Sequence, residues 1–452
     1  MKQAQSIRSL ALDLLIQRER GHGDITDLVK GAFAADAAGE SARDRAFLKQ
    51  LTVGTVERLI TLDALIDRLA SAPVRSQKPT VRNALRMGAY QILYMDGVAD
   101  HAAVDESVQL VKTRLSVKPA GFVNAILRRI VRERERFLQE IDEADPPVRY
   151  SLPPYLWELF EKERGRAQAE RICASFFVPR DLTIRPDPRL LKDAERYDEW
   201  ERALAQAVPG LRHHPMLPQF LQLPDPGDLR RLPGYAEGCF TVQDAAGALA
   251  VAAAGIRPED RVLDVCAAPG GKSLYAAALL NDPSQLLARD VSEEKCARLR
   301  ENAERMRLSG MQIEVFDATL FDYSAVEGYD VVLCDLPCSG YGVLGRKPEI
   351  RYRAGEAQTE SLVRLQRDIL SNAARYVRPG GTLIYSTCTV SRAENEDNAA
   401  WLASEYPYRL TDWMDAELPG SIRGAVRDGC LQILPGEQES DGFFIARFRR
   451  TE

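Results

Sequence analysis

Two cysteines stand at positions where a thiol could act on a nucleic-acid base. Cys338 lies in the run Tyr329-Asp-Val-Val-Leu-Cys-Asp-Leu-Pro-Cys-Ser-Gly340, and Cys388 lies in Thr382-Leu-Ile-Tyr-Ser-Thr-Cys-Thr-Val390. Each follows a short apolar run that is typical of a buried strand. A thiolate can attack an electron-poor ring, and a second thiol nearby can help to complete the reaction. The pair therefore indicates methylation of a pyrimidine at carbon.

The chemistry explains why such an enzyme would need these groups. Carbon-5 of cytosine is a poor nucleophile, but a thiolate that adds to carbon-6 turns the ring into an enamine that can accept a methyl group. The route needs an activated thiol, an acid or hydrogen bond at N3 and removal of the carbon-5 proton. Asp335 is placed for the N3 role, for which its carboxyl group would have to be protonated. Spacing alone does not decide which thiol attacks.

A glycine-rich loop, Cys266-Ala-Ala-Pro-Gly-Gly-Lys-Ser273, follows another predicted strand. A Walker phosphate loop needs a glycine six residues before its lysine, and that position is Cys266, while the dinucleotide motif GxGxxG is also absent. Asp290 and Asp317 end the next two predicted strands, where carboxylates suit ribose hydroxyls and an adenine amino group. The set predicts a nucleoside without phosphates, with S-adenosylmethionine as the natural candidate. Asp264 is a weaker contact candidate.

The histidines exclude two other kinds of site from the second half of the chain. All four, His22, His101, His213 and His214, precede the glycine-rich loop. A Cys/His catalytic pair and a histidine-rich metal site are therefore not expected there, and no metal is predicted. The adjacent His213 and His214 lack partners at metal-ligand spacing and are expected in a surface loop.

These motifs lie in an alternation of strands and helices that begins near residue 261. Strands are predicted at 261–266, 285–290, 313–316, 329–334 and 382–386, and helices at 272–280, 293–308, 360–377 and 393–404. This pattern is typical of a doubly wound α/β sheet, which binds ligands at the carboxyl ends of its strands.

The N-terminal part has a different pattern. Residues 1–140 read as nearly all helix, and they hold 22 Lys and Arg against 17 Asp and Glu, whereas the rest of the chain holds 38 against 49. A basic module on an acidic chain indicates a polyanionic partner, although a solvated surface without a partner gives the same count. The helix at 101–112 and the run Gly121-Phe-Val-Asn-Ala-Ile-Leu-Arg128 resemble NusB-type RNA-binding domains. Residues 146–233 contain 13 of the 25 prolines and are predicted to form a small α+β domain with a helix at 155–174.

The catalytic half resembles the RNA cytosine-C5 methyltransferases of the NOL1/NOP2/Sun group. The resemblance rests on Val242-Gln-Asp244, on the loop from Val262 to Ser273, on Asp335-Leu-Pro-Cys-Ser-Gly340, on Ser386-Thr-Cys-Thr389 with Glu394-Asn-Glu396, and on Gly442-Phe-Phe-Ile-Ala-Arg447. Together with the NusB-like part, the architecture is similar to the bacterial Sun/RsmB-type members. It implies methylation of a cytosine in 16S ribosomal RNA, free or in an early small-subunit particle.

The resemblance also implies roles for individual residues. Cys388 matches the thiol that attacks carbon-6, and Cys338 matches the one that helps to eliminate the enzyme. The contacts to S-adenosylmethionine that it implies are Cys266, Ala267, Ala268, Pro269, Gly270, Gly271, Lys272, Asp290, Asp317 and Asp335. In two places the chain departs from the family: Leu336 replaces a usual alanine and is expected to tighten the loop under the base, and Ile184-Arg-Pro186 replaces an RNA-contact motif. Four basic residues after Cys338 are candidates to line the RNA path: Arg346, Lys347, Arg351 and Arg353.

The sequence thus predicts a multidomain enzyme: an all-α NusB-like domain at 1–140, a small α+β domain at 146–235 and a Rossmann-like methyltransferase domain at 236–452. No apolar run approaches the roughly 18 residues of a membrane span. The eight cysteines contain no CxxC pair and are typical of reduced cytosolic thiols. A cytoplasmic monomer is expected. Two alternatives stay open at this point: the same chemistry on another RNA such as tRNA, and an RNA-binding assembly factor.

Overall fold

The computed structural model describes residues 6–35, 41–413, 418 and 420–451. The chain divides into two compact units. Unit 1 comprises residues 1–173 and 346–354, and unit 2 comprises residues 174–345 and 355–452. The three domains predicted from the sequence stay a prediction, but the short segment 346–354 already shows that the grouping in space does not follow the order of the sequence.

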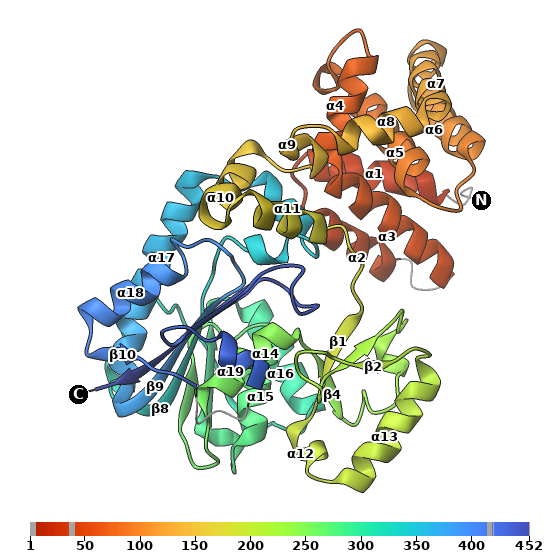
Figure 1. Ribbon diagram of the computed structural model, residues 1–452. Coiled ribbons are helices and arrows are strands. Elements are labelled where there is room, and N and C mark those ends of the chain that lie inside the picture. Colours follow the sequence, from red (N-terminus) through yellow and green to blue (C-terminus); the bar gives the residue numbers. More distant parts are fainter. Residues whose placement is uncertain (1–5, 36–40, 414–417, 419, 452) are drawn as a thin grey trace. The chain divides into compact units, whose positions relative to one another are not determined.

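Unit 1 is all helical in its described residues (Figure 1). Its α-helices are α1 (Ile7–Glu19), α2 (Ile25–Ala35), α3 (Ala42–Glu57), α4 (Leu59–Leu69), α5 (Pro79–Tyr94), α6 (Asp100–Arg114), α7 (Val117–Arg132), α8 (Arg134–Asp142), α9 (Pro146–Arg149), α10 (Pro154–Arg164) and most of α11 (Arg166–Ser175). Buried Leu12, Leu85 and Leu127 belong to one apolar core. Helices α3 and α5 approach closely at Gly54, where an added Cβ would lie 1.9 Å from the Tyr90 hydroxyl oxygen.

The segment 346–354 packs into unit 1 through polar contacts as well as apolar ones. Glu349 forms an ion pair with Arg18 at 2.8 Å. Arg351 is fully buried and donates to the backbone carbonyl oxygens of Glu57, at 2.9 Å, and Ser151, at 3.3 Å. The expectation that Arg351 lines an RNA path is therefore wrong, because its guanidinium group is used inside unit 1. Arg353 pairs with Asp24 of the same unit.

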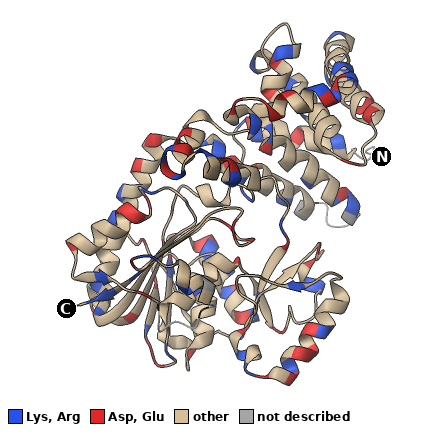
Figure 2. Ribbon diagram, viewed as in Figure 1, with Lys and Arg blue, Asp and Glu red and all other residues tan. Residues whose placement is uncertain are grey.

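Charged residues of both signs cover the unit 1 helices (Figure 2). Lys112, Lys118 and Arg128 are exposed, as expected for residues that could meet a polyanion. By contrast, Glu133 forms ion pairs with Arg129, Arg132 and Arg136. The predicted basic cluster is therefore partly neutralised by its own carboxylates.

Unit 2 contains a small antiparallel sheet built from the proline-rich middle segment. Within the described residues its order is β2-β3-β1-β4, with β1 (Leu182–Pro186), β2 (Arg212–His213), β3 (Leu221–Leu223) and β4 (Phe240–Val242). Helices α12 (Pro188–Leu191) and α13 (Ala194–Ala207) accompany it. The helix predicted at 155–174 is interrupted at Gly165, whose φ is +76°, and α11 (Arg166–Ser175) follows.

The predicted surface loop at the two histidines is wrong. His213 is exposed but ends strand β2, and its Nε2 lies 2.9 Å from a carboxylate oxygen of Glu201. His214 is buried, and its Nδ1 accepts a hydrogen bond from the Met216 N–H at 3.1 Å. Both rings have structural partners.

The larger sheet of unit 2 follows the predicted α/β alternation. Its described strands have the order β10-β12-β9-β8-β5-β6-β7, with β11 paired to β12. They are β5 (Val262–Asp264), β6 (Leu286–Asp290), β7 (Gln312–Val315), β8 (Tyr329–Asp335), β9 (Val377–Thr387), β10 (Tyr408–Leu410), β11 (Cys430–Ile433) and β12 (Phe443–Arg450). Strands β5 to β9 pair in parallel, and β12 adds to β9 in the antiparallel sense.

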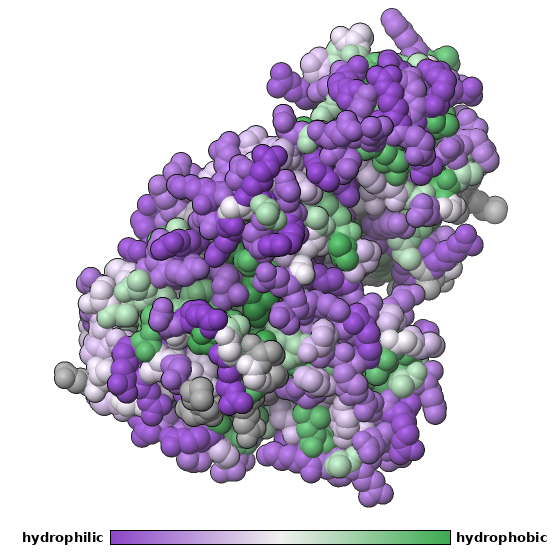
Figure 3. All heavy atoms as spheres, viewed as in Figure 1, coloured by the Kyte–Doolittle hydropathy of each residue, from purple (hydrophilic) through white to green (hydrophobic). Residues whose placement is uncertain are grey.

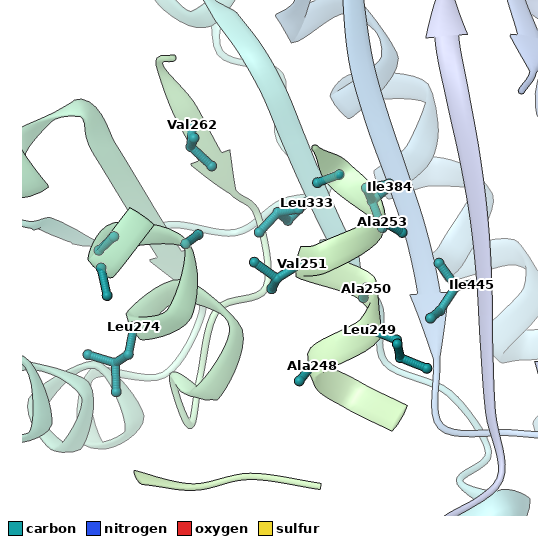
Figure 4. Close-up of a cluster of buried hydrophobic side chains, with 14 of the residues drawn as sticks. Ala248, Leu249, Ala250, Val251, Ala253, Val262, Leu274, Leu333, Ile384 and Ile445 are labelled. Atoms are coloured by element: carbon teal, nitrogen blue, oxygen red, sulfur yellow. The ribbon is translucent and has the colours of Figure 1, made fainter. Parts of the chain in front are cut away.

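Helices cover both faces of this sheet. Helices α14 (Ala245–Ala254), α15 (Gly271–Leu279) and α16 (Glu293–Arg305) contribute to the core on one face, and α17 (Glu356–Tyr376) and α18 (Glu396–Glu405) to the core on the other. Figure 4 shows Leu249 and Val251 of α14 lying against Leu333, Ile384 and Ile445 of the sheet. Side chains alternate between the two cores along β5, β6, β8, β9 and β12, as the pleat requires.

The predicted fold class is confirmed: a helical N-terminal unit, a small α+β segment and an α/β methyltransferase-type sheet. Strand β12 and the alanine-rich α14 were not predicted. Hydrophilic residues cover most of the face seen in Figure 3, with hydrophobic residues in scattered patches. None of the described helices is long and apolar enough to cross a membrane.

Candidate active site

The parallel strands bring distant parts of the sequence to one edge of the sheet. Strands β5, β6, β8 and β9 end at Asp264, Asp290, Asp335 and Thr387. Because parallel strands place their carboxyl ends at the same edge, the loops that follow them are neighbours. Asp335 pairs in register with Ser386 across β8 and β9. The two cysteines therefore leave adjacent strands, although many residues separate them in the chain.

The two thiols are in contact. The Sγ atoms of Cys338 and Cys388 lie 3.3 Å apart, and both side chains are partly exposed. Backbone hydrogen bonds fix the two loops, from the Leu336 N–H to the Ser386 carbonyl oxygen at 3.0 Å and from the Gly342 N–H to the Cys388 carbonyl oxygen at 3.0 Å. The contact with Cys388, together with burial, raises the pKa of the Cys338 thiol well above its usual range.

An ion pair lies at the same edge. The Lys272 ammonium donates to Asp335 Oδ2 at 2.6 Å, and the Ser386 hydroxyl donates to Asp335 Oδ1 at 2.8 Å. Both oxygens of the Asp335 carboxyl group therefore accept hydrogen bonds. Burial lowers the pKa of Lys272, but the charges of Asp335, Asp264 and Cys388 more than offset it and raise the pKa overall. Lys272 therefore carries its positive charge beside both Asp335 and Cys388.

The glycine-rich loop is tied to the strand ends by carboxylates. Asp290 Oδ2 accepts from the Ala268 N–H at 3.2 Å, and its Oδ1 accepts from the Ser292 N–H at 3.1 Å. Gly270 has a φ of +109°, and an added Cβ there would lie 2.3 Å from a Leu299 methyl carbon. Only glycine fits this position without strain.

Asp264 has a structural part in this loop. It is buried, accepts from the Ser273 hydroxyl at 2.6 Å and from the Cys266 N–H at 3.3 Å, and so joins the end of β5 to the start of α15. Burial raises its pKa to about 6. Burial also raises the pKa of the Cys266 thiol, so this third sulfur stays neutral and is a poor nucleophile.

The side chains at this edge suit a nucleoside better than a phosphate. Asp290 and Asp317 present carboxylate oxygens, and Asp317, which is exposed, uses only Oδ1 for the N–H and hydroxyl of Thr319. Carboxylates accept from hydroxyl and amino groups and repel phosphates. The nearby cation, Lys272, is already paired with Asp335. These residues fit S-adenosylmethionine.

The predicted residues fall into an inner and an outer group. In the inner group Cys338 contacts Cys388, and Lys272 contacts Asp335, whereas Asp317 lies exposed after the end of β7. Leu336 is buried in the core on the α17 face. Its expected tightening of the loop under the base stays a prediction.

Other side chains were misjudged or missed. Arg185 is buried, donates to Gln243 Oε1 at 2.7 Å and stacks 4.4 Å from the Tyr275 ring centre, so it braces the domain instead of presenting itself to RNA. Glu394 and Gln366 lie beneath the thiols but were assigned no role. The Glu394-Asn-Glu396 motif was the available signal for the first, whereas no pattern marked Gln366. Among the described residues no group of side chains could hold a metal ion.

Comparison with known proteins gives matches over both parts of the chain. The family model described as 16S rRNA methyltransferase RsmB/F matches residues 252–449, and the NusB family matches residues 5–132. A probable ribosomal RNA small subunit methyltransferase B of Synechocystis sp. is 36% identical over 91% of this chain and 92% of that protein. A probable ribosomal RNA small subunit methyltransferase B of Bacillus subtilis is 32% identical over 98% of this chain and 99% of that protein.

Solved structures agree on the fold. The crystal structure of PH0851 matches with a TM-score of 0.76 at 23% identity, over 99% of this chain and 100% of that one. NSun6 from Pyrococcus horikoshii matches with a TM-score of 0.56 at 19% identity, over 66% of this chain and 98% of that one. The NusB-like N-terminal part and the methyltransferase part expected from the sequence are both confirmed.

Proposed function

Because the chain belongs to the RsmB/F family of 16S rRNA methyltransferases, we propose that it methylates carbon-5 of a cytosine in 16S ribosomal RNA through a covalent bond between a cysteine and carbon-6. Enzymes of this family are S-adenosylmethionine-dependent methyltransferases. The observation that carries the proposal is the contact of two thiols, 3.3 Å apart, at the ligand-binding edge of the sheet. A methyltransferase that acts on nitrogen or oxygen has no need of a thiol pair.

Cys388 is the better nucleophile of the two on electrostatic grounds. The Lys272 cation interacts with Cys388, and a cation stabilises a thiolate. The thiolate adds to carbon-6, the electron pair moves to carbon-5, and carbon-5 then takes the methyl group.

Cys338 fits the release step. Its raised pKa keeps it protonated at rest, so it must first lose its proton to water, and the thiolate that results is a strong base that can accept the carbon-5 proton. After methyl transfer, loss of the carbon-5 proton toward Cys338 restores the ring double bond and expels Cys388 from carbon-6. Both sulfurs must reach the same ring, which the 3.3 Å separation supports.

The ion pair suits recognition of cytosine. An Asp335 carboxyl oxygen can accept from the exocyclic amino group, which uracil lacks, while the Lys272 ammonium can supply the proton donor that N3 needs. In this arrangement N3 does not need a proton from Asp335, both of whose carboxyl oxygens accept hydrogen bonds; the protonated Asp335 expected from the sequence stays a prediction.

The carboxylates at the strand ends are suited to the methyl donor. Asp290 and Asp317 would hold the ribose hydroxyls and the adenine amino group, and the loop from Cys266 to Lys272 would lie along the donor. When bound, S-adenosylmethionine supplies an electrophilic methyl group. The protein's part is to orient this group toward carbon-5 and to hold the cysteines opposite the ring.

The RNA would bind through exposed cations such as Lys112, Lys118 and Arg128, whose phosphate contacts position RNA without reading its sequence. An rRNA substrate would place the enzyme, as a monomer, in the cytoplasm. Mapping 5-methylcytosine in total RNA from cells with and without the gene tests the substrate. Loss of one cytosine methylation in 16S rRNA is expected, whereas loss confined to tRNA would overturn the rRNA assignment.

The covalent mechanism is tested with Cys388→Ala and Cys338→Ala. The first is expected to lower methyl transfer to 16S rRNA by on the order of 10³-fold or more, because the nucleophile is gone. The second is expected to accumulate an RNA–protein adduct that resists denaturation, because bond formation continues while release slows. Full activity of Cys388→Ala would refute the mechanism, and a Cys338→Ala enzyme without adduct would refute the release role. Cys430→Ala, which lies in β11 outside the thiol pair, is the matched control.

A further inference from the structure

A fully buried carboxylate lies beneath the two thiols. Glu394 is 0% exposed, and its partners are neutral donors. Its Oε1 accepts from the Ser339 N–H at 2.8 Å and from Gln366 Nε2 at 3.0 Å, and its Oε2 accepts from the Ser339 hydroxyl at 2.6 Å. A buried carboxylate is costly unless its oxygens accept hydrogen bonds, so this geometry is tightly specified.

The acceptor joins the two cysteine loops. Ser339 follows Cys338 directly in the chain, and Thr389 follows Cys388. The Ser339 and Thr389 hydroxyl oxygens lie 2.7 Å apart, and the Thr389 hydroxyl lies 3.5 Å from Glu394 Oε2. Glu394 is thus bonded directly to Ser339, which follows Cys338. Through the Ser339 hydroxyl it is connected to Thr389, which follows Cys388.

The next residue fixes the Cys388 side. Asn395 Nδ2 donates to the Thr389 carbonyl oxygen at 3.1 Å, and the Thr387 hydroxyl donates to Asn395 Oδ1 at 2.6 Å. Thr387 and Thr389 flank Cys388 on both sides. Glu394 therefore joins the two loops, and the next residue, Asn395, fixes the Cys388 loop on both sides of the cysteine.

A glutamine on α17 orients the carboxylate. Gln366 Nε2 donates to Glu394 Oε1 and also to the Pro337 carbonyl oxygen at 2.9 Å, just before Cys338. Asn398 in turn donates to Gln366 Oε1 at 2.8 Å. The side chain of Glu394 is therefore held from the helix side as well.

We propose that Glu394 is a positioning residue that sets the separation of the Cys338 and Cys388 thiols. The ladder between β8 and β9 pairs residues only as far as Asp335 and Ser386. Beyond it, two backbone bonds join the loops, from the Leu336 N–H to the Ser386 carbonyl oxygen and from the Gly342 N–H to the Cys388 carbonyl oxygen, but neither involves Ser339 or Thr389. Glu394 supplies the cross-link that the ladder lacks. The inference rests on the proposed function for its catalytic meaning, but the separation of the thiols can be measured without any methyl transfer.

Glutamine at this position separates geometry from charge. Its oxygen can accept from the Ser339 N–H and Gln366, and its amide nitrogen can donate to the Ser339 hydroxyl, whose own proton then turns to Thr389. Glu394→Gln therefore keeps the cross-link without the charge, whereas Glu394→Ala removes it. Glu405→Ala, at the exposed end of α18, is the matched control.

The direct test is oxidation of the thiols by diamide, whose N=N bond takes two electrons and two protons as the disulfide forms. Mass spectrometry measures the rate at which the Cys338–Cys388 linked peptide appears. Wild type, Glu394→Gln and Glu405→Ala are expected to cross-link readily, and Glu394→Ala at least about tenfold more slowly, because the loops are no longer held together. Equal rates in wild type and Glu394→Ala would overturn the proposal.

Methyl transfer gives the second readout. Glu394→Ala is expected to lower kcat at unchanged KM for RNA, and Glu394→Gln to retain most of kcat. A Glu394→Gln enzyme as inactive as Glu394→Ala, yet cross-linking normally, would overturn positioning in favour of a role for the charge. Should Glu394→Ala not fold, Ser339→Ala and Thr389→Val each remove one arm of the network. Slower cross-linking in both supports the proposal, and unchanged rates in both overturn it.

The two proposals fail separately. Normal methyl transfer by Cys388→Ala would overturn the covalent mechanism and leave the cross-linking result intact. Slow cross-linking of wild type itself would overturn the positioning role while the covalent mechanism remained testable by adduct formation.

Discussion

The surroundings of the two cysteines differ in charge. On the Cys388 side lies Lys272, a cation paired with Asp335. On the Cys338 side lies Glu394, a buried carboxylate whose negative charge contributes to the raised pKa of that thiol, after the contact with Cys388 and burial. Two residues of the same type, 3.3 Å apart, thus have different charged neighbours.

This difference is informative because the proposed covalent chemistry needs unequal thiols. The nucleophile must be available as a thiolate, which a lowered thiol pKa favours. The thiol that takes the carbon-5 proton in the last step is a stronger base, once deprotonated, when its pKa is raised. A nearby cation lowers the thiol pKa, and a nearby carboxylate raises it. The fold can therefore divide the work between two identical side chains through their neighbours alone.

Removing the Lys272 cation should have the largest effect on methyl transfer and on the difference between the two thiols. Lys272→Met is expected to lower methyl transfer on the order of 10²-fold, because the thiolate of Cys388 and the carboxylate of Asp335 both lose their counter-charge. Losing a cation raises a thiol pKa, so alkylation of Cys388 by iodoacetamide should slow about tenfold at neutral pH and recover at higher pH. Alkylation is measured without cofactor, by peptide mass spectrometry, with exposed Lys192→Met as control. An unchanged pH profile would contradict the assignment of Lys272.

Removing the charge of Glu394 should reduce the difference between the two thiols by making Cys338 more reactive. Glu394→Gln is expected to lower the pKa of the Cys338 thiol, since the negative charge that raises it is gone. Alkylation of Cys338 at neutral pH should then rise by about 3- to 10-fold, while that of Cys388 changes less. The same peptide assay measures both. Slower alkylation of Cys338 would mean that the charge of Glu394 does not act on this thiol.

Removing the neutral hydrogen-bond donor Ser386 should have the smallest effect on methyl transfer. Ser386→Ala removes the hydroxyl bond to Asp335 Oδ1, worth about 1 kcal/mol, and should lower kcat about fivefold. Steady-state kinetics on 16S rRNA measures this, with Ser371→Ala on α17 as control. A loss as large as that of Lys272→Met would show that the hydroxyl, and not the cation, controls Asp335.

The predictable part of the fold was the part with short-range signals. The strands that end at Asp264, Asp290 and Asp335 were predicted because apolar runs and the residues after them are local in sequence. The alanine-rich α14 was missed because a helix that is apolar all round shows no amphipathic period. Arg351 was misjudged because charge suggests exposure, whereas its partners Glu57 and Ser151 are distant in sequence.

The sequence by itself determined the chemistry: two thiols, a glycine-rich loop without a phosphate motif, carboxylates after successive strands and no histidine in the catalytic half. It could not distinguish the thiols, because a similar strand precedes each of them and their spacing in the sequence does not show which charged groups lie near each one. Only the tertiary structure put Lys272 beside Cys388 and Glu394 beneath Ser339, next to Cys338. The physical reason is that ionisation depends on burial and on charges a few ångströms away, and these neighbours come from different strands and helices.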